Sequence, residues 1–218
     1  PSEHRALDDL TVGASSLSDA DVQIAGGLAA IRELSDHRLE LWSQSPVLEI
    51  QLALLAPAAG DWTIVVRNVL PDATLVEGST VHTRQPGDRP TVATFVVPLA
   101  GGMHVLRVAP PDAASLGRFR VAAMADIQTA LPVVDDVFRA INAVPDLRFV
   151  VAMGDLTERG DLDEYDLYER QLEVLDIPFY TTIGNHELWN DHFRFLDRFG
   201  RANFQFEFKG AAFTFVDS

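Results

Sequence analysis

The sequence of 218 residues contains no cysteine, which excludes disulfide bonds and thiolate metal sites but does not decide the cellular compartment. It also lacks an apolar run long enough to span a bilayer. Basic residues are few, because 17 Lys and Arg stand against 32 Asp and Glu and leave a net charge of -15. Such a surface repels nucleic acid and anionic membranes, so a phosphate substrate would need local positive charge in order to approach.

What the sequence does contain is three apolar segments, each followed by a short polar signature. Apolar residues make up 47% of the chain, which is ample for a packed core. The segments read as strands over Arg118–Ala125, Leu147–Met153 and Ile177–Ile183, and their signatures are Asp126-Ile127-Gln128, Gly154-Asp155 and Gly184-Asn185-His186-Glu187. The signatures recur about every 30 residues, which is the length of one strand–helix–strand unit.

The two segments that connect these strands have helical periodicity. In the second, Asp161 can cap a helix with Glu164 three residues later, and apolar residues recur on one face. Strands joined by helical crossovers predict a parallel sheet that is covered on both faces. The carboxyl ends of parallel strands meet at one edge, so we expect Asp126, Asp155 and Asn185 to share that edge.

The chemistry of these residues indicates a metal site. Neighbouring strands lie about 4.8 Å apart, so carboxylates on adjacent strand ends repel each other unless a cation lies between them. Oxygen donors with an imidazole nearby suit Mn, Mg, Fe or Zn, and a pair of such ions could polarise a phosphoryl group and activate water. The sequence therefore predicts a metal site for phosphate chemistry.

In this order and spacing, the three signatures resemble the first three motifs of the calcineurin-like metallophosphoesterases, written D-x-H, G-D-x-x-[DE]-R-G and G-N-H-[DE]. The resemblance covers Arg118 to Ser218. It implies metal-dependent hydrolysis of a phosphate mono- or diester by a metal-activated hydroxide, with two divalent ions as cofactors (Mn, Fe, Zn or Mg).

The resemblance also implies a role for each matching residue. Asp126 would bind one metal, Asp155 would bridge both, and Asn185 would bind the second. His186 would contact the phosphate or protonate the leaving group. Arg159 is a candidate for substrate binding.

Two departures from the family pattern support a rival hypothesis. Gln128 stands where the family has a histidine ligand, and an amide oxygen would bind its metal less tightly or prefer a harder ion. The family's further histidines, including a G-H-x-H motif, do not occur before Ser218. We therefore expect half of a catalytic domain with an uncovered apolar strand, completed by a separate chain or by a missing carboxy-terminal half. The rival is a non-catalytic binding or assembly protein on a degenerate or incomplete phosphoesterase scaffold.

The first half of the chain has a different pattern. Residues 1 to about 25 read as a flexible lead-in, and from Gly27 to about Leu116 apolar and polar residues alternate between turn signals. This predicts an all-β antiparallel sandwich that resembles immunoglobulin-like or fibronectin-like domains. We expect a β-sandwich domain over residues 1–117 and the first half of an α/β/β/α phosphoesterase domain over residues 118–218. By analogy, this layout suggests a secreted or periplasmic location, with the cytoplasm left open.

Each candidate also has an ordinary structural interpretation. Asp126, Asp155 and Asn185 could fix loops or turns, and Gln128 could make a structural hydrogen bond. Two acids are interpreted as supporting or surface residues: Glu158 and Glu187. The other histidines have no partner spacing and are interpreted as structural: His4, His37, His82, His104 and His192. Alternating aromatics are expected in the core or against a partner: Phe204, Phe206, Phe208, Phe213 and Phe215.

Overall fold

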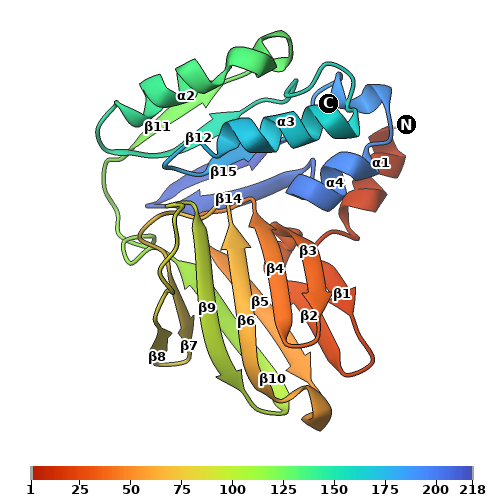
Figure 1. The fold of residues 1–218 in the computed structure, drawn as a ribbon, viewed down its shortest axis with the longest axis vertical. Helices are drawn as coiled ribbons and strands as arrows, with labels where there is room; N and C mark the ends of the chain where they lie inside the picture. The colour runs from red at the N-terminus through yellow and green to blue at the C-terminus, as the bar shows by residue number, and fades with distance from the viewer. Residues whose placement is uncertain (1, 218) are drawn as a thin grey trace.

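The computed structural model describes residues 2–217, which form two layered halves, one above the other in Figure 1. Strands dominate and helices are few. The amino-terminal half consists of two β-sheets, and the carboxy-terminal half of a parallel sheet with helices on one face and a β-hairpin on the other. Within residues 2–217, no helix is long and apolar enough to cross a membrane.

The two sheets of the amino-terminal half share one apolar core. The first has the order β1-β2-β5-β10-β7-β8, with bounds Ala14–Ser16, Ala20–Ile24, Leu48–Leu54, Gly102–Ala109, Thr74–Glu77 and Thr80–His82. The second has the order β3-β4-β6-β9, with bounds Ala29–Ser35, Arg38–Ser43, Gly60–Arg67 and Val92–Leu99. Every second residue of β5 is buried, as the alternating pattern predicts. The likeness to immunoglobulin or fibronectin domains stays a prediction.

One strand pair differs from the expected antiparallel arrangement. Strands β4 and β6 pair in parallel, with Leu41 opposite Val66. After β4 the chain crosses to the other sheet as β5 and returns through the 3-10 turn η2 (Ala56–Ala58), so β6 runs in the same direction as β4. The antiparallel prediction is wrong at this pair. Apolar and polar residues alternate in the same way in a strand that changes sheets as in one that does not, so the sequence pattern does not reveal the change.

A cluster of one acid and two histidines lies at the edge of the first sheet. His104 on β10 has Nδ1 2.6 Å from Glu77 Oε1 and Nε2 2.8 Å from the Ala100 carbonyl oxygen. His82 on β8 has a buried Nε2 3.9 Å from the other oxygen of Glu77. Burial lowers the pKa of His104, but the hydrogen bonds to Glu77 and Ala100 outweigh this effect and raise the pKa overall. The site therefore favours the imidazolium form.

This cluster makes stability depend on pH. Because the pKa of His104 is raised in the folded state, its contribution to stability should be fully present below pH 6.5 and be lost as the pH rises through the raised value. In Glu77→Gln the free energy of unfolding at pH 6 should fall by about 1.5–3 kcal/mol and should vary less with pH. Urea unfolding from pH 6 to pH 9 measures both effects, with the exposed Glu49→Gln on β5 as the control. Equal pH slopes in Glu77→Gln and the unmodified protein would contradict this prediction.

The carboxy-terminal half contains the predicted parallel sheet. Its order is β11-β12-β13, with bounds Arg120–Met124, Leu147–Ala152 and Phe179–Thr181, and both pairs are parallel. The crossovers contain η3 (Gln128–Val133), α2 (Asp135–Asn142) and α3 (Leu162–Leu172). The predicted capping box of Asp161 and Glu164 is present at the start of α3. A short turn η4 (Glu187–Trp189) and helix α4 (Phe193–Phe199) follow β13.

The two faces of this sheet have different cover. Helix α3 packs on one face, where the Tyr168 ring contacts Phe179 of β13. The hairpin of β14 (Phe204–Phe208) and β15 (Ala211–Phe215) packs on the other face, where Phe206 and Phe208 contact Phe149 of β12. Four of the five alternating aromatics are therefore buried in the core, which was one of the two expected places: Phe204, Phe206, Phe208 and Phe215. Phe213 is half-buried against it. In the described part of the chain, β15 pairs only with β14.

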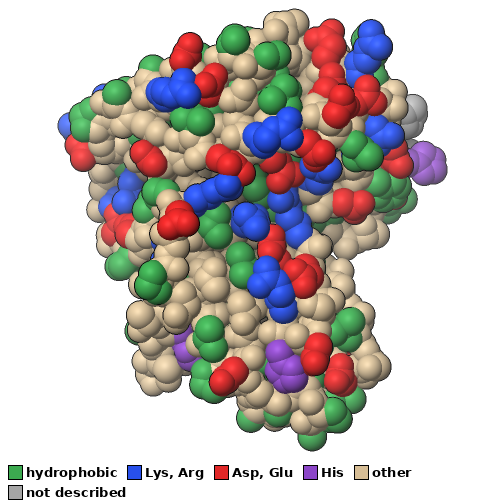
Figure 2. Space-filling model, in the orientation of Figure 1, with side chains coloured by type: hydrophobic (Ala, Val, Ile, Leu, Met, Phe, Trp, Pro, Cys, Tyr) green, Lys and Arg blue, Asp and Glu red, His purple; other side chains and the backbone are tan. Residues whose placement is uncertain are grey.

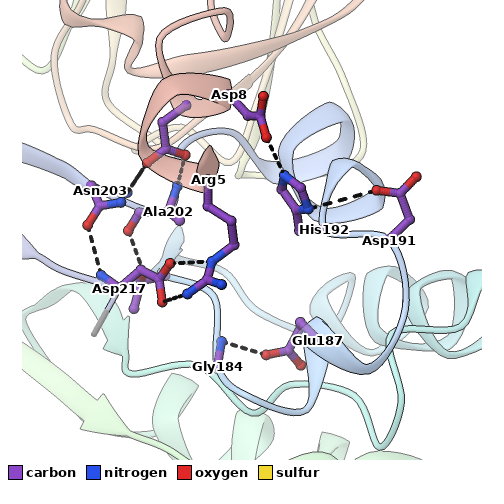
Figure 3. Close-up of polar contacts among 11 residues, drawn as sticks. Arg5, Asp8, Gly184, Glu187, Asp191, His192, Ala202, Asn203 and Asp217 are labelled. Atoms are coloured by element: carbon purple, nitrogen blue, oxygen red, sulfur yellow. Dashed lines mark hydrogen bonds and ion pairs between the residues drawn. The ribbon is translucent and has the colours of Figure 1, made fainter. Parts of the chain in front are cut away.

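The first residues differ from the expected lead-in, because they form helix α1 (Ser2–Asp9), followed by β1 and β2. Asp9 is 3% exposed and accepts hydrogen bonds of 2.7 to 2.9 Å from the Ala202 amide and from the backbone and side chain of Asn203. Figure 3 shows Ala202 and Asn203 beside the bidentate ion pair of Arg5 with Asp217. The partners of α1 lie far along the chain, so its own segment contains no signal of this docking and reads as a flexible lead-in.

The two halves meet along a charged seam. Figure 2 shows Lys, Arg, Asp and Glu side chains gathered where the halves adjoin. Arg32 on β3 binds both oxygens of Glu169 on α3, at 2.8 and 3.1 Å, and its guanidinium lies 4.2 Å from the Trp42 ring centroid. Buried Asn68 donates to the Phe179 carbonyl oxygen and accepts from the Phe179 amide. These contacts attach the parallel sheet to the sheets below it, while the domain boundary after residue 117 stays a prediction.

Candidate functional site

Three loops follow the neighbouring carboxyl ends of β11, β12 and β13. The strand registers place Met124 beside Ala152, and Ala152 beside Thr181, so the loops begin at one edge of the sheet. The common edge that the sequence predicted is therefore confirmed for the backbone. Asp126 and Asp155 have positive φ angles of 57° and 53°. This conformation is uncommon outside glycine and often occurs at functional sites.

Two glycines allow the second and third loops to approach closely. A Cβ atom at Gly184 would overlap the Asp155 carboxylate, and a Cβ atom at Gly154 would lie only 2.5 Å from the Gly184 amide nitrogen. Asp155 Oδ1 accepts a hydrogen bond of 3.2 Å from the His186 amide. The glycines of both signatures are therefore packing requirements, because a larger residue at 184 would overlap the Asp155 carboxylate and one at 154 would overlap the Gly184 backbone.

Glu187 holds the second and third loops together. It is fully buried, and its carboxylate accepts hydrogen bonds of 2.7 to 3.0 Å from the backbone amides of residues 155, 156, 157 and 184. The Thr157 hydroxyl donates another at 2.9 Å, and Figure 3 shows the bond from Gly184. The surface interpretation of Glu187 is wrong and its supporting role is confirmed. The sequence signal for this supporting role was the acid at the fourth position of the third motif, G-N-H-[DE].

His186 is oriented by two neighbours. Its Nδ1 lies 2.7 Å from the Glu158 carbonyl oxygen, so Nδ1 carries the hydrogen and Nε2 is left for another partner. The ring stacks on Trp189, with centroids 5.7 Å apart and planes 6° apart. The hydrogen bond to Glu158 raises the pKa of His186, burial opposes it, and nearby carboxylates add to the increase. The imidazole can therefore act as a proton donor through Nε2.

Gln128 has an unsatisfied polar atom beside the second loop. Its backbone amide donates to the Asp155 carbonyl oxygen at 3.1 Å, which fixes the first loop against the second. Its side-chain Oε1 is buried and has no hydrogen-bond partner among residues 2–217. A buried amide oxygen without a partner destabilises a protein by about 1–3 kcal/mol, and a divalent cation would satisfy it.

The predicted ligands form an all-oxygen donor set. Asp126 and Asp155 supply carboxylates, and Gln128 and Asn185 supply amide oxygens. Within the described residues, no three His, Asp or Glu side chains are arranged to hold a metal ion by themselves, so a metal here would require the amide oxygens. Hard oxygen donors fit Mg²⁺ or Mn²⁺ better than Zn²⁺.

A cleft of about 650 Å³ lies beside these loops. Asp155, Asn185 and Leu188 line it together with residues 213–217. The structure therefore brings Asp155 and Asn185 to one cleft. Asp126, Gln128 and His186 are not among the residues that line it.

Arg159 is not placed on the cleft. It is exposed, and its guanidinium forms no ion pair with residues 2–217. Only its backbone has a supporting contact, because the amide donates to Glu164 and the carbonyl oxygen accepts from Asn190. A role for its side chain in substrate binding stays a prediction.

Comparison with known proteins gives these loops a context. Residues 119–217 match the family model of the calcineurin-like phosphoesterases. A protein of Arcobacter nitrofigilis named "Probable glycerophosphodiester phosphodiesterase GpdQ" is 39% identical over 46 residues, which are 21% of this chain and 17% of that protein. The solved structure of purple acid phosphatase PPD1 from yellow lupin (Lupinus luteus) seeds is 11% identical with a TM-score of 0.38, over 87% of this chain and 45% of that one. The chain thus covers less than half the length of either protein.

Proposed function

Because residues 119–217 belong to the calcineurin-like phosphoesterase family, we propose that this protein hydrolyses a phosphate ester with the help of divalent metal ions. The observation that carries the proposal is the convergence of the Asp155 and Asn185 loops on one cleft. The buried and unpartnered Gln128 Oε1, on the loop whose backbone binds the Asp155 carbonyl oxygen, supports it. Enzymes of this class need several oxygen donors and a proton donor at one sheet edge. The three loops offer both.

Four residues would hold the metal ions: Asp126, Gln128, Asp155 and Asn185. When bound, the ions would supply an activated water and neutralise charge on the phosphoryl oxygens. Asp155 would hold metal from the junction of the second and third loops, because its carboxylate lies over Gly184.

His186 would assist departure of the alcohol. Its Nδ1–H is held by the Glu158 carbonyl oxygen, so the proton for the leaving oxygen would come from Nε2. Glu187 would keep His186 in place through the amides of the surrounding loops. A phosphodiester is the first substrate to test, because the relative from Arcobacter nitrofigilis is named a glycerophosphodiester phosphodiesterase.

A metal analysis with a paired activity assay tests the proposal. The purified protein is dialysed against chelator, reloaded with Mg²⁺, Mn²⁺ or Zn²⁺, and assayed with bis(p-nitrophenyl) phosphate and p-nitrophenyl phosphate. Turnover that is lost with chelator and restored by metal is expected. Metal binding without turnover on either ester would favour the rival hypothesis of a binding or assembly protein. If the protein showed no metal binding and no turnover, the proposed metal site itself would be wrong.

Gln128→His should strengthen metal binding. The change restores the histidine of the family's first motif and replaces an amide oxygen by a better donor for transition metals. We expect the affinity for Mn²⁺ or Zn²⁺ to rise on the order of tenfold, which corresponds to about 1.4 kcal/mol. Isothermal titration calorimetry measures the change, and Gln205→His on the exposed face of β14 is the matched control. An unchanged affinity would mean that Gln128 is not a ligand.

A further inference from the structure

The chain has three tryptophans, and they differ in exposure. Trp62 is 1% exposed and Trp42 is 8% exposed, whereas Trp189 is 64% exposed. Indole rings are mostly buried in folded proteins, and an exposed ring in a fixed position is typical of a binding surface. Packing in the core therefore explains the presence of Trp42 and Trp62 but not that of Trp189.

The position of Trp189 is fixed on both sides. It ends the turn η4, its amide donates to the His186 carbonyl oxygen at 3.3 Å, and Glu187 within the same turn is fully buried. The following residue, Asn190, donates two side-chain hydrogen bonds of 2.9 Å to the loop before α3. The exposed indole is thus attached to the same framework that holds His186.

The Trp189 ring stacks on His186, the residue proposed to protonate the leaving group. The imidazole and indole planes are parallel to within 6°, and their centroids are 5.7 Å apart. His186 uses Nδ1 for its bond to Glu158, so Nε2 is the atom that would meet the leaving oxygen. We therefore expect a flat group attached to that oxygen to come within reach of the indole, which is stacked on His186 and exposed.

We propose that Trp189 determines specificity by stacking on a planar, unsaturated group of the substrate, such as a nucleobase or an aryl ring next to the phosphate. This inference rests on the proposed phosphoesterase function. Stacking suits a protein with a net charge of -15, because a neutral ring adds affinity without a cationic partner. Stacking of a base on an aromatic side chain changes affinity by about tenfold or more.

Tryptophan fluorescence gives a direct test. With Mg²⁺ present, adenosine 5′-monophosphate should quench the emission and bind about tenfold or more tightly than ribose 5-phosphate, which lacks the base. By calorimetry, Trp189→Leu should bind both probes with equal affinity, and Trp189→Tyr should retain the preference. Phe193→Leu, which removes another aromatic with 40% exposure, is the control that should keep both the quenching and the preference.

Several outcomes would overturn the inference. These are equal affinity for the two probes in the unmodified protein, no binding of either probe, and a preference that persists in Trp189→Leu. A changed oligomeric state in Trp189→Leu with unchanged binding would also overturn it and would assign the ring to a protein contact. Turnover assays separate the two proposals. An intact preference without turnover counts against the phosphoesterase function alone, whereas turnover without a preference counts against the role of Trp189 alone.

Discussion

Asp155→Asn should lower turnover of a phosphate ester by about 10³-fold or more, because a negative charge that would hold the metal ions is lost, together with several kcal/mol of transition-state stabilisation. Asparagine tolerates the left-handed backbone at this position, where φ is 53°. Its side-chain oxygen can still accept the hydrogen bond from the His186 amide. The substitution therefore removes the charge and leaves the loop in place.

Steady-state kinetics with metal in excess measures this effect, and urea unfolding checks that the fold is retained. Asp146→Asn is the matched control, since Asp146 is an exposed aspartate with a φ of 62° just before β12. Its turnover should equal that of the unmodified protein. If Asp155→Asn kept more than a tenth of the turnover, the proposed role of Asp155 in metal binding would be wrong.

Glu187→Ala should destabilise the fold by on the order of 4 kcal/mol or more. The change leaves the buried amides of residues 155, 156, 157 and 184 without an acceptor, and each unpaired group costs about 1–3 kcal/mol. A loss of this size approaches the total stability of many domains. Urea unfolding should show a large decrease in the midpoint.

Glu187→Gln should have an intermediate effect. The amide oxygen of Gln can still accept the hydrogen bonds that Glu187 Oε1 accepts. Its NH₂ group would face the Gly184 amide, which is also a donor, so that hydrogen bond would be lost. Glu207→Gln changes an exposed glutamate of β14 and should alter stability by less than about 0.5 kcal/mol. A midpoint for Glu187→Ala that matched this control would show that the loops do not depend on the buried carboxylate.

The sequence predicted those features that depend on neighbouring residues. The parallel sheet follows from apolar strands and helical crossovers within about 30 residues of one another, and the cap of α3 follows from Asp161 and Glu164, three positions apart. The shared edge of the Asp126, Asp155 and Asn185 loops follows from the sheet. For this reason the sheet edge that carries the three loops could be predicted without coordinates.

Other features depend on partners that are distant in the sequence. The second-loop donors that bind Glu187 lie 30 to 32 residues from it in the sequence. Its place in the third motif was the available signal, but the motif does not show whether this acid is buried or at the surface. The pairing of His104 with Glu77 spans 27 residues and joins two strands whose order the sequence did not give. The parallel pair of β4 and β6 was missed for the same reason, since the change of sheet at β5 leaves the alternation intact.

The docking of α1 has a consequence for the order of folding during translation. Asp9 is synthesised 193 residues before Ala202, whose amide donates a hydrogen bond to it. Arg5 is synthesised 212 residues before its partner Asp217. A nascent chain can form the amino-terminal sheets early, because their strands are complete by Ala109. Helix α1 is therefore among the last elements of residues 2–217 to reach its final place, and until then its side chains are open to chaperones and proteases.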